Sequence, residues 1–268
     1  MNSLYSRQSF LGPDSEAMIA DCRLGIIGLG GGGSHIVQQA AHLGIKHYVI
    51  YDPQDIEDTN LNRLVGATLA DVGAPKTSVA ERVIFGLHPS ADIVTRTMRW
   101  QDDPEPYLRA CDIIIGCVDG TQERLELEAL ARRYIIPLID IGMDVHVIQP
   151  ESPRMAGQII LSMPGGPCLK CFGAIPEDNV VQNAYGEAGG RPQVVWANGI
   201  LASTAIGMLV DLITNWSQTL SSLPYLQYDG NAHTVLPHVR LSHMPPNSVC
   251  PHFPLGKVGP PIFRNIVQ

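Results

Sequence analysis

The sequence has little charge, few aromatic residues and no long apolar run. Charged residues make up 16% of the 268 residues, and aromatic residues make up 6%. The 18 Lys and Arg residues are scattered along a chain of formal net charge −8, so we expect no nucleic-acid partner. No uninterrupted apolar run reaches about 18 residues, the length that spans a bilayer, so we expect no membrane association.

Disulfides and an export signal are also not indicated. Six cysteines in a chain of this length do not resemble a disulfide framework. The first residues, MNSLYSRQSFLGPDSEA, lack the charged-then-apolar layout of a signal peptide. We therefore expect free thiols or metal ligands in a soluble, cytoplasmic protein. A hydrophobic content of 45% lets the chain bury the core of one domain or of one domain with an appendage.

Strands and helices alternate through the first half of the chain. An apolar strand (24–27), a glycine-rich turn, a helix (33–43) and a second strand (47–52) form a βαβ unit, which implies a parallel sheet. The alternation continues with predicted helices at 76–88 and 121–134 and predicted strands at 91–98, 111–119 and 135–142. We expect an α/β fold with a Rossmann-like, doubly wound, mostly parallel sheet, whose nucleotide-binding half is 1–145.

The second half, 146–268, has a different pattern within what we expect to be a single domain over 1–268. A strand begins near residue 157, and a polar, glycine-rich stretch without periodicity (174–193) predicts a long loop of functional importance. A long apolar helix (196–216) and two C-terminal strands (225–229 and 233–240) follow, before a tail rich in proline.

The glycine-rich turn predicts a nucleotide site. Gly28, Gly30 and Gly33 fit G-x-G-x-x-G between a strand and a helix, where they allow a tight turn, close phosphate approach and close helix–strand packing. Asp52 ends the second strand, where a carboxylate can accept hydrogen bonds from ribose hydroxyls. The alternative is a glycine-rich turn without a ligand. This pattern alone does not separate a dinucleotide from ATP.

The residues after Asp52 favour a triphosphate. Asn60, Arg63 and Lys76 follow the second strand, and cations there can hold charge that moves during phosphate chemistry. Each of these cations could instead be a solvated surface charge. Asp119 follows an apolar strand, where it could hold Mg²⁺ on phosphates or instead cap the helix at 121–134.

Six short motifs, taken together, resemble the ThiF/MoeB group of ATP-dependent adenylyltransferases, which are homologous to ubiquitin-activating enzymes. They occur in the family's order and rough spacing over most of the chain: YSRQSFLG (5–12), GLGGGGS (28–34), NLNR (60–63), GAPK (73–76), CVDG (117–120) and GGPCLKCFG (165–173). The resemblance implies an enzyme that activates the C-terminal glycine carboxylate of a ubiquitin-like or sulfur-carrier protein. The carboxylate would attack the α-phosphate of ATP and give an acyl-adenylate and pyrophosphate.

The resemblance also assigns roles to matching positions. It implies that Asp52 holds the ribose, that Asn60 and Arg63 hold the phosphates, that Lys76 holds the α-phosphate and that Asp119 holds Mg²⁺. Arg7 matches an arginine that reaches the partner subunit's site in relatives, which implies a homodimer with shared sites. The helix at 196–216 is apolar around most of its circumference, which agrees with burial in such a dimer.

A Cys-x-x-Cys motif predicts a zinc-binding extension in the half that would also bind the carrier. Cys168 and Cys171 have the spacing of half a structural zinc site. Relatives complete the site with a second Cys-x-x-Cys; here the stretch NSVCPHF offers Cys250 and His252, with Phe253 at the fourth position. His238 or His243 could substitute, and a redox pair is the main rival interpretation.

A second departure concerns covalent chemistry. Some relatives carry a thioester-forming cysteine after the zinc pair, but 174–193 contains none. We therefore expect adenylation without an obligatory thioester on this chain. The alternatives are another ATP-dependent activity of the same fold (tRNA modification or peptide adenylation), an NAD-dependent oxidoreductase, or a nucleotide-binding regulator without catalysis.

Overall fold

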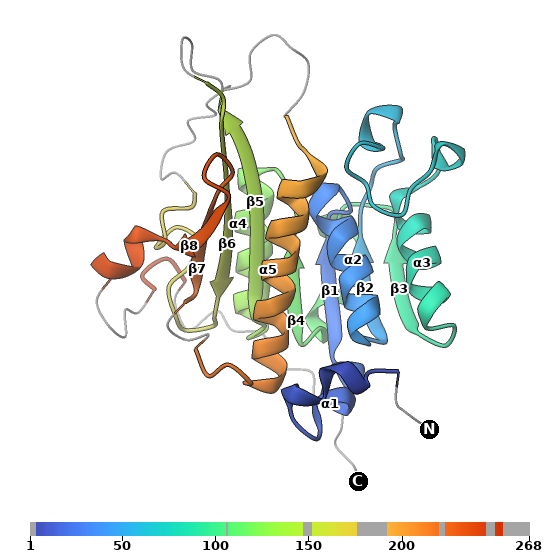
Figure 1. Cartoon of the computed structure of the whole chain (residues 1–268), viewed down its shortest axis with the longest axis horizontal. Coiled ribbons are helices and arrows are strands. Elements are labelled where there is room, and N and C mark those ends of the chain that lie inside the picture. The colour runs from blue at the N-terminus through green and yellow to red at the C-terminus, as the bar shows by residue number, and fades with distance from the viewer. Residues whose placement is uncertain are drawn as a thin grey trace.

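A computed structural model describes residues 4–105, 107–146, 152–175, 192–219, 223–244 and 250–253. Figure 1 shows that these residues are organised around one sheet, whose eight strands have the order β3-β2-β1-β4-β5-β6-β7-β8. The strands are β1 (Arg23–Ile27), β2 (His47–Tyr51), β3 (Asp92–Arg96), β4 (Ile113–Gly116), β5 (Leu138–His146), β6 (Arg154–Ser162), β7 (Tyr225–Asp229) and β8 (Thr234–Pro237).

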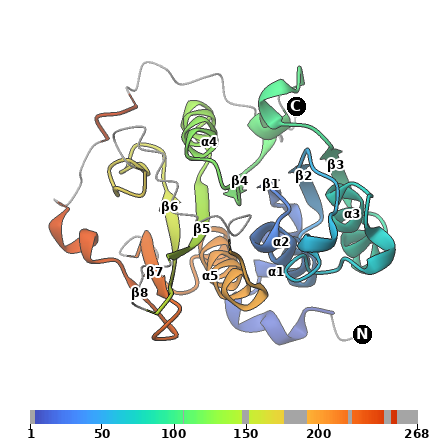
Figure 2. The same ribbon diagram turned by 90° about the horizontal axis from the view of Figure 1, so that it is seen from above.

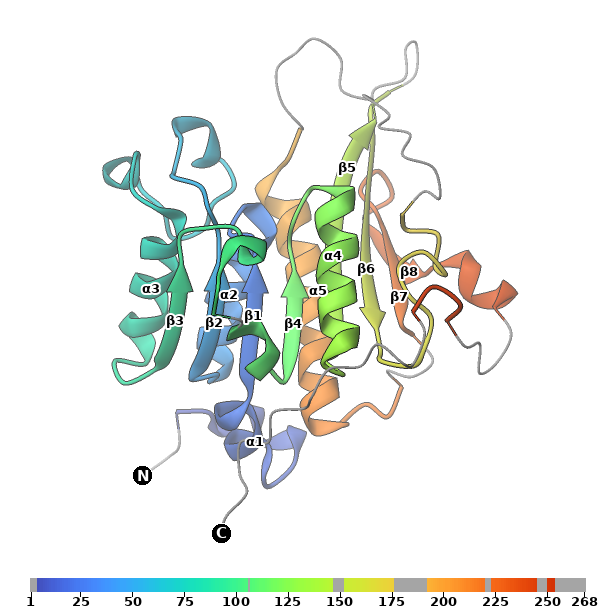
Figure 3. The same ribbon diagram turned by 180° about the vertical axis from the view of Figure 1, so that it is seen from behind.

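Helices cover both faces of the sheet. Helices α2, α3 and α5 lie on one face and α4 lies on the other, as Figures 2 and 3 show from above and from behind. A short helix, α1, sits at the end of the sheet where β1 begins. The helices are α1 (Ser15–Asp21), α2 (Gly31–Leu43), α3 (Lys76–Leu87), α4 (Thr121–Arg133) and α5 (Val195–Thr214).

The strand pairing confirms the predicted fold class. Strands β3, β2, β1, β4 and β5 pair in parallel, whereas β6, β7 and β8 continue the sheet in antiparallel pairs. Residues from both predicted halves therefore belong to one sheet. The division at residue 145 into a nucleotide-binding half and a carrier-binding half stays a prediction. The four positions of β4 are all buried, as expected for a parallel strand covered on both faces.

Several predicted strands differ from the structure in their bounds. Those predicted at 91–98 and 233–240 are shortened to β3 and β8, and the strand predicted from near residue 157 begins at Arg154. The strand predicted at 111–119 is reduced to β4, because the chain leaves the sheet after Gly116 to reach α4. The strand predicted at 135–142 begins at Leu138 and continues to His146, because β5 pairs along its whole length with antiparallel β6. A pattern in one segment could not reveal that second partner.

The order of the strands creates a crevice. From β1 the chain moves outward to β2 and β3, and it then crosses back to place β4 on the other side of β1. The connections after β1 and β4 therefore diverge to opposite faces, and ligands of this architecture bind where they part, at the carboxyl ends of the strands.

The two largest clusters of the core lie one on each face of the sheet. The α5-side core joins α2, α3 and α5 to the sheet and includes Ile26, Val37, Ile84, Ile139 and Leu201. The α4-side core joins α4 to the opposite face and includes Ile27, Val49, Leu108, Ile114 and Leu127. The crevice thus has walls from two separate apolar clusters.

Helix α5 is the one helix in the described ranges that is long and apolar enough to cross a membrane. More than half of its apolar stretch is buried, and it packs against α2, β5 and β6. Burial in this core accounts for its apolar character. The exposed aromatic residues Trp196 and Trp216 lie near its two ends.

Candidate active site

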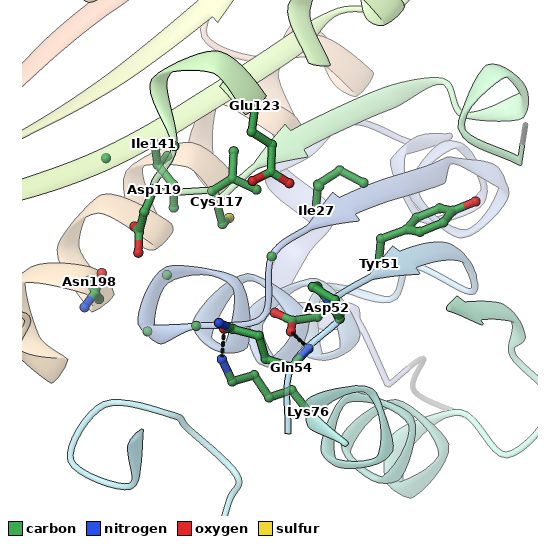
Figure 4. A pocket seen from close by; sticks show the side chains of 18 of the residues that line it. Ile27, Tyr51, Asp52, Gln54, Lys76, Cys117, Asp119, Glu123, Ile141 and Asn198 are labelled. Carbon is green, nitrogen blue, oxygen red and sulfur yellow. Dashed lines mark hydrogen bonds between the residues drawn. The ribbon is translucent and has the colours of Figure 1, made fainter. Parts of the chain in front are cut away.

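A cavity of about 330 Å³ opens at the carboxyl ends of β1, β2 and β4 (Figure 4). It lies in the crevice predicted by the strand order. Its lining includes six residues predicted for the site, from segments far apart in the chain: Gly28, Gly30, Asp52, Arg63, Lys76 and Asp119.

The three motif glycines have different environments. Gly28 has a φ of +88°, and a Cβ added there would lie 2.7 Å from the carbonyl oxygen of Cys117. A Cβ on Gly33 would lie 1.8 Å from the carbonyl oxygen of Gly28, so the α2 backbone packs directly on the turn. A Cβ on Gly30 would meet nothing within 4 Å. Gly30 thus leaves backbone open toward the cavity, at the start of a helix whose free N–H groups attract anions.

Asp52 is buried at the end of β2 and fixes the turn around the cavity. Its Oδ2 accepts a hydrogen bond from the backbone N–H of Leu29 at 2.6 Å, and its Oδ1 accepts one from Gln54 at 2.8 Å. Each oxygen retains a further lone pair, since a carboxylate oxygen can accept more than one hydrogen bond. The geometry is compatible with the predicted ribose contact.

Both of the predicted cations line the same cavity. Lys76 is the first residue of α3 and is 6% exposed, with its Nζ 2.6 Å from Gln54 Oε1. Arg63 donates from Nη1 to the carbonyl oxygen of Thr59 at 2.8 Å and to Asn62 Oδ1 at 3.0 Å. All three of these partners are neutral, so none of these hydrogen bonds is an ion pair that would compete with an anionic ligand.

Asn60 is buried and does not line the cavity. Its Oδ1 accepts from the backbone N–H of Glu57 at 3.4 Å, and the carbonyl oxygen of Asn60 accepts from the N–H of Arg63 at 3.0 Å. In this structure Asn60 shapes the turn that carries Arg63, and direct phosphate contact stays a prediction.

Asp119 lines the cavity from the loop between β4 and α4. It lies three residues beyond the end of β4, and Gln193 Nε2 approaches its Oδ1 at 3.4 Å. The N-cap position of α4 is Gly120, so Asp119 precedes the N-cap in this structure. An exposed carboxylate beside two phosphate-seeking cations suits a hard cation such as Mg²⁺.

Sequence reasoning missed several residues of the cavity wall. Met98, Arg99 and Trp100 come from the segment after β3, Glu123 from the first turn of α4, and Asn198 from α5. Burial raises the pKa of Glu123, although the positive charge of Arg99 opposes this effect. No local sequence pattern marks any of these residues, because Asp119 precedes α4 and its spacing to Glu123 is not a helical one.

The thiol of Cys117 also lines the cavity. Burial raises its pKa well above the usual range, and the negative charges of Asp140 and Asp119 add to that effect. At neutral pH this group is a thiol and a poor nucleophile. This observation supports the expectation that no thioester on Cys117 is required.

Four potential metal ligands meet about the Cys-x-x-Cys turn. The Sγ of Cys171 lies 3.6 Å from that of Cys168 and 3.8 Å from that of Cys250, and His252 Nδ1 lies 3.3 Å from Cys168 Sγ. All four ligand atoms are within 4.8 Å of one another. Thiolates on a tetrahedral zinc ion, with bonds of about 2.3 Å, lie about 3.8 Å apart. The cluster therefore fits a tetrahedral metal ion.

The other candidate histidines lie elsewhere in this structure. His238 stacks on the ring of Tyr225, with ring centroids 4.0 Å apart, and His243 Nδ1 lies 3.2 Å from the carbonyl oxygen of Val239. Neither belongs to the metal-ligand cluster. The geometry thus favours His252 as the fourth ligand over both of them.

A buried ion pair joins this turn to α4. Glu128 accepts the backbone N–H of Leu169 at 3.1 Å and the hydroxyl of Ser162 at 2.6 Å. Arg132, 3.3 Å from Glu128, donates to the carbonyl oxygen of Pro167 at 2.8 Å. The metal cluster is thereby fixed to the face of α4 that turns away from the solvent.

Arg7 lies far from the cavity of its own chain. It is exposed in the short segment Ser6–Leu11, which lies beside α1 at the opposite end of the sheet (Figure 1). The hydroxyl of Tyr5, close to Arg7 in sequence, lies 3.1 Å from Nε2 of His88, just past the end of α3. The cavity lies at the other end of this helix, where Lys76 is the first residue of α3. An action of Arg7 on an active site therefore needs a second copy of the chain.

The fold, the site and the matches to known proteins define the class of protein. A model of the ThiF family matches residues 5–252, and the chain belongs to this family. It is similar to a SAMP-activating enzyme E1 of Haloferax volcanii, at 27% identity over 77% of this chain and 75% of that protein. It is also similar to a molybdopterin-synthase adenylyltransferase of Salmonella typhimurium, at 27% identity over 84% of this chain and 87% of the relative. Several of the relatives, among them molybdopterin-synthase and ThiS adenylyltransferases, are thus named as adenylyltransferases.

The fold also matches a solved structure. The crystal structure of MccB of E. coli with ATP superposes with a TM-score of 0.71 at 20% sequence identity, over 89% of this chain and 71% of that chain. This likeness confirms the architecture.

Proposed function

We propose that the protein uses ATP to adenylate the C-terminal glycine carboxylate of a ubiquitin-like or sulfur-carrier protein. The observation that carries the proposal is the cavity, where the open backbone of Gly30, the cations Lys76 and Arg63 and the carboxylate of Asp119 meet. The names of the relatives, a SAMP-activating enzyme and a molybdopterin-synthase adenylyltransferase, support a carrier protein as substrate.

The proposed reaction joins two anions. A carboxylate oxygen of the carrier attacks the α-phosphorus of ATP, the bond from that phosphorus to the β-phosphate oxygen breaks, and pyrophosphate leaves. The carboxylate is already ionised at neutral pH, so no general base is needed. Lys76, Arg63 and the first N–H groups of α2 would hold the anions together and stabilise the charge that develops on the phosphates.

We further propose two metal ions with different tasks. Asp119 would hold Mg²⁺, which neutralises phosphate charge when bound. Cys168, Cys171, Cys250 and His252 would hold a structural Zn²⁺, because their donor set and spacing suit that ion. This site joins ligands separated by 82 positions, from residue 168 to residue 250.

Pyrophosphate exchange tests the proposed activity. The protein, ATP, Mg²⁺ and radiolabelled pyrophosphate are mixed with a small β-grasp protein that ends in glycine. Label should enter ATP only when this carrier is present, and a matched carrier extended by one residue beyond the glycine should not support exchange. Exchange that depends on a short peptide or on tRNA would favour the alternatives, and reduction of NAD⁺ would favour an oxidoreductase.

We also propose a homodimer in which Arg7 completes the partner's active site. Exposed Phe10 packs edge-on against exposed Trp216, with ring centroids 5.6 Å apart, so an aromatic surface lies near the end of α5 beside the Arg7 segment. Such an exposed apolar patch is typical of an interface.

Mixing two inactive variants tests the shared site. Arg7→Ala and Asp119→Ala should each lose exchange activity and keep the fold. After subunit exchange, mixtures should regain activity, because one site of each heterodimer has both wild-type residues. A monomer in light scattering, or no rescue in mixtures shown to contain heterodimers, would reject the shared site.

A further inference from the structure

The cavity has two chemically different sides. Gly30, Lys76 and Asn198 come from the helices of the α5-side face, and they present backbone N–H groups, a cation and an amide. The opposite wall belongs to the α4-side core, which includes Ile27 and against which Met98, Trp100 and Val118 pack. One side therefore suits an anion and the other suits a flat apolar ring.

Asp52 lies between these two sides, directly after the last residue of β2. A nucleotide has the same order of parts, since its ribose separates the phosphates from the base. If the phosphates lie at the start of α2, as the proposed function requires, the ribose lies beside Asp52 and the base lies against the α4-side wall. The following inference rests on that placement.

Glu123 is the acidic residue of the α4-side wall. Figure 4 shows its side chain pointing from α4 into the cavity toward Ile27, while Asp119 points toward the other side. Among the hydrogen bonds within the described ranges, none is formed by its carboxylate. The next residue, Arg124, donates from Nε to buried Asp140 on β5 at 2.9 Å, so the first turn of α4 is anchored to the sheet.

We propose that Glu123 is a specificity-determining residue that accepts a hydrogen bond from the exocyclic amino group of adenine. Adenine offers an N–H donor at this position, whereas guanine carries a carbonyl oxygen there, which would repel a carboxylate. The side chain of Glu123 is partly buried, and burial raises its pKa because the charge is less well solvated there than in water. A hydrogen bond from the base replaces part of that lost solvation. Hydrogen bonds to charged groups contribute about 1.5–3 kcal/mol, or roughly a ten- to hundred-fold preference.

The test combines a change in the protein with a change in the base. The affinities of the wild-type protein and of Glu123→Ala are measured by calorimetry for ATP, for purine riboside triphosphate, which lacks the amino group, and for GTP. Wild-type protein should bind ATP about ten- to hundred-fold more tightly than purine riboside triphosphate, and Glu123→Ala should bind the two almost equally. Glu126→Ala is the matched control, because it removes the same charge from the same helix but does not line the cavity.

Each outcome has one meaning. Equal affinity of wild-type protein for ATP and purine riboside triphosphate would overturn the proposal, as would an equal loss for both ligands in Glu123→Ala. A wild-type preference for GTP would also overturn it, because the carboxylate would then bind a different edge of the base. If Glu123→Ala does not fold, Glu123→Gln provides the comparison and should weaken the preference, because its neutral amide oxygen accepts more weakly. Absence of any triphosphate binding by wild-type protein would instead refute the proposed function.

Discussion

Substituting alanine at Gly33 and at Gly30 should give opposite results. The Cβ of Gly33→Ala would lie 1.8 Å from the carbonyl oxygen of Gly28, while real Cβ contacts essentially never fall below 3.0 Å. Helix α2 or the turn must therefore move by at least 1.2 Å, the difference between these distances. Both partners are backbone, so no side chain can rotate away. Overpacking of this kind costs about 3 kcal/mol or more.

Calorimetry measures this cost. For a protein of this size each kcal/mol lowers the melting temperature by about 2–4 °C, so Gly33→Ala should melt roughly 6–12 °C lower or fail to fold. Gly30→Ala should melt close to the wild-type temperature, because its Cβ meets nothing and its φ of −67° suits alanine. It should nevertheless bind ATP more weakly, since the methyl group occupies the space where a phosphate approaches.

The two glycine variants can each contradict the account. A wild-type melting temperature for Gly33→Ala would refute the close packing of α2 on the turn. Unchanged ATP affinity for Gly30→Ala would refute the placement of the phosphates at the start of α2.

Three further changes test other parts of the site. Lys76→Ala should lower kcat about 10²- to 10³-fold and change ATP affinity less, because charge on the α-phosphate peaks in the transition state. A loss of ATP affinity with unchanged kcat would instead show that Lys76 acts in ground-state binding. The purified protein should contain one zinc ion for each set of four ligands, and Cys171→Ala should lose this ion and melt at a lower temperature. If protein purified without chelator contains no metal, the proposed zinc site is wrong. Iodoacetamide at pH 8 should modify Cys117 much more slowly in the folded protein than in the unfolded chain, because the raised pKa of Cys117 leaves little reactive thiolate at that pH. Rapid modification of the folded protein would show that the thiol is activated.

The sequence was sufficient to predict the βαβ architecture and the side of the cavity that suits an anion. Parallel strands carry strong apolar signals, and the roles of Gly28 and Gly33 follow from their positions between a strand and a helix. The metal-ligand cluster could be predicted in part, since Cys168 and Cys171 are close in sequence. Their meeting with His252 depends on the fold of the last described residues.

The base side of the cavity could not be predicted, for a physical reason. Its wall is assembled from the end of β1, the segment after β3 and the start of α4, and their meeting depends on the strand order. Trp100 and Glu123 carry no local motif for this role. The predicted loop at 174–193 lies almost entirely outside the described residues, so its function stays a prediction.

Mass spectrometry of the carrier protein tests the central claim most directly. The protein is incubated with ATP, Mg²⁺ and a β-grasp protein that ends in glycine, and the reaction is stopped in acid to preserve an acyl phosphate anhydride. The account predicts that the carrier gains the mass of one adenylate group at its C-terminal glycine and that an equal amount of pyrophosphate is released. The account would be contradicted if metal-loaded protein binds both ATP and the carrier but forms neither the adenylated carrier nor pyrophosphate.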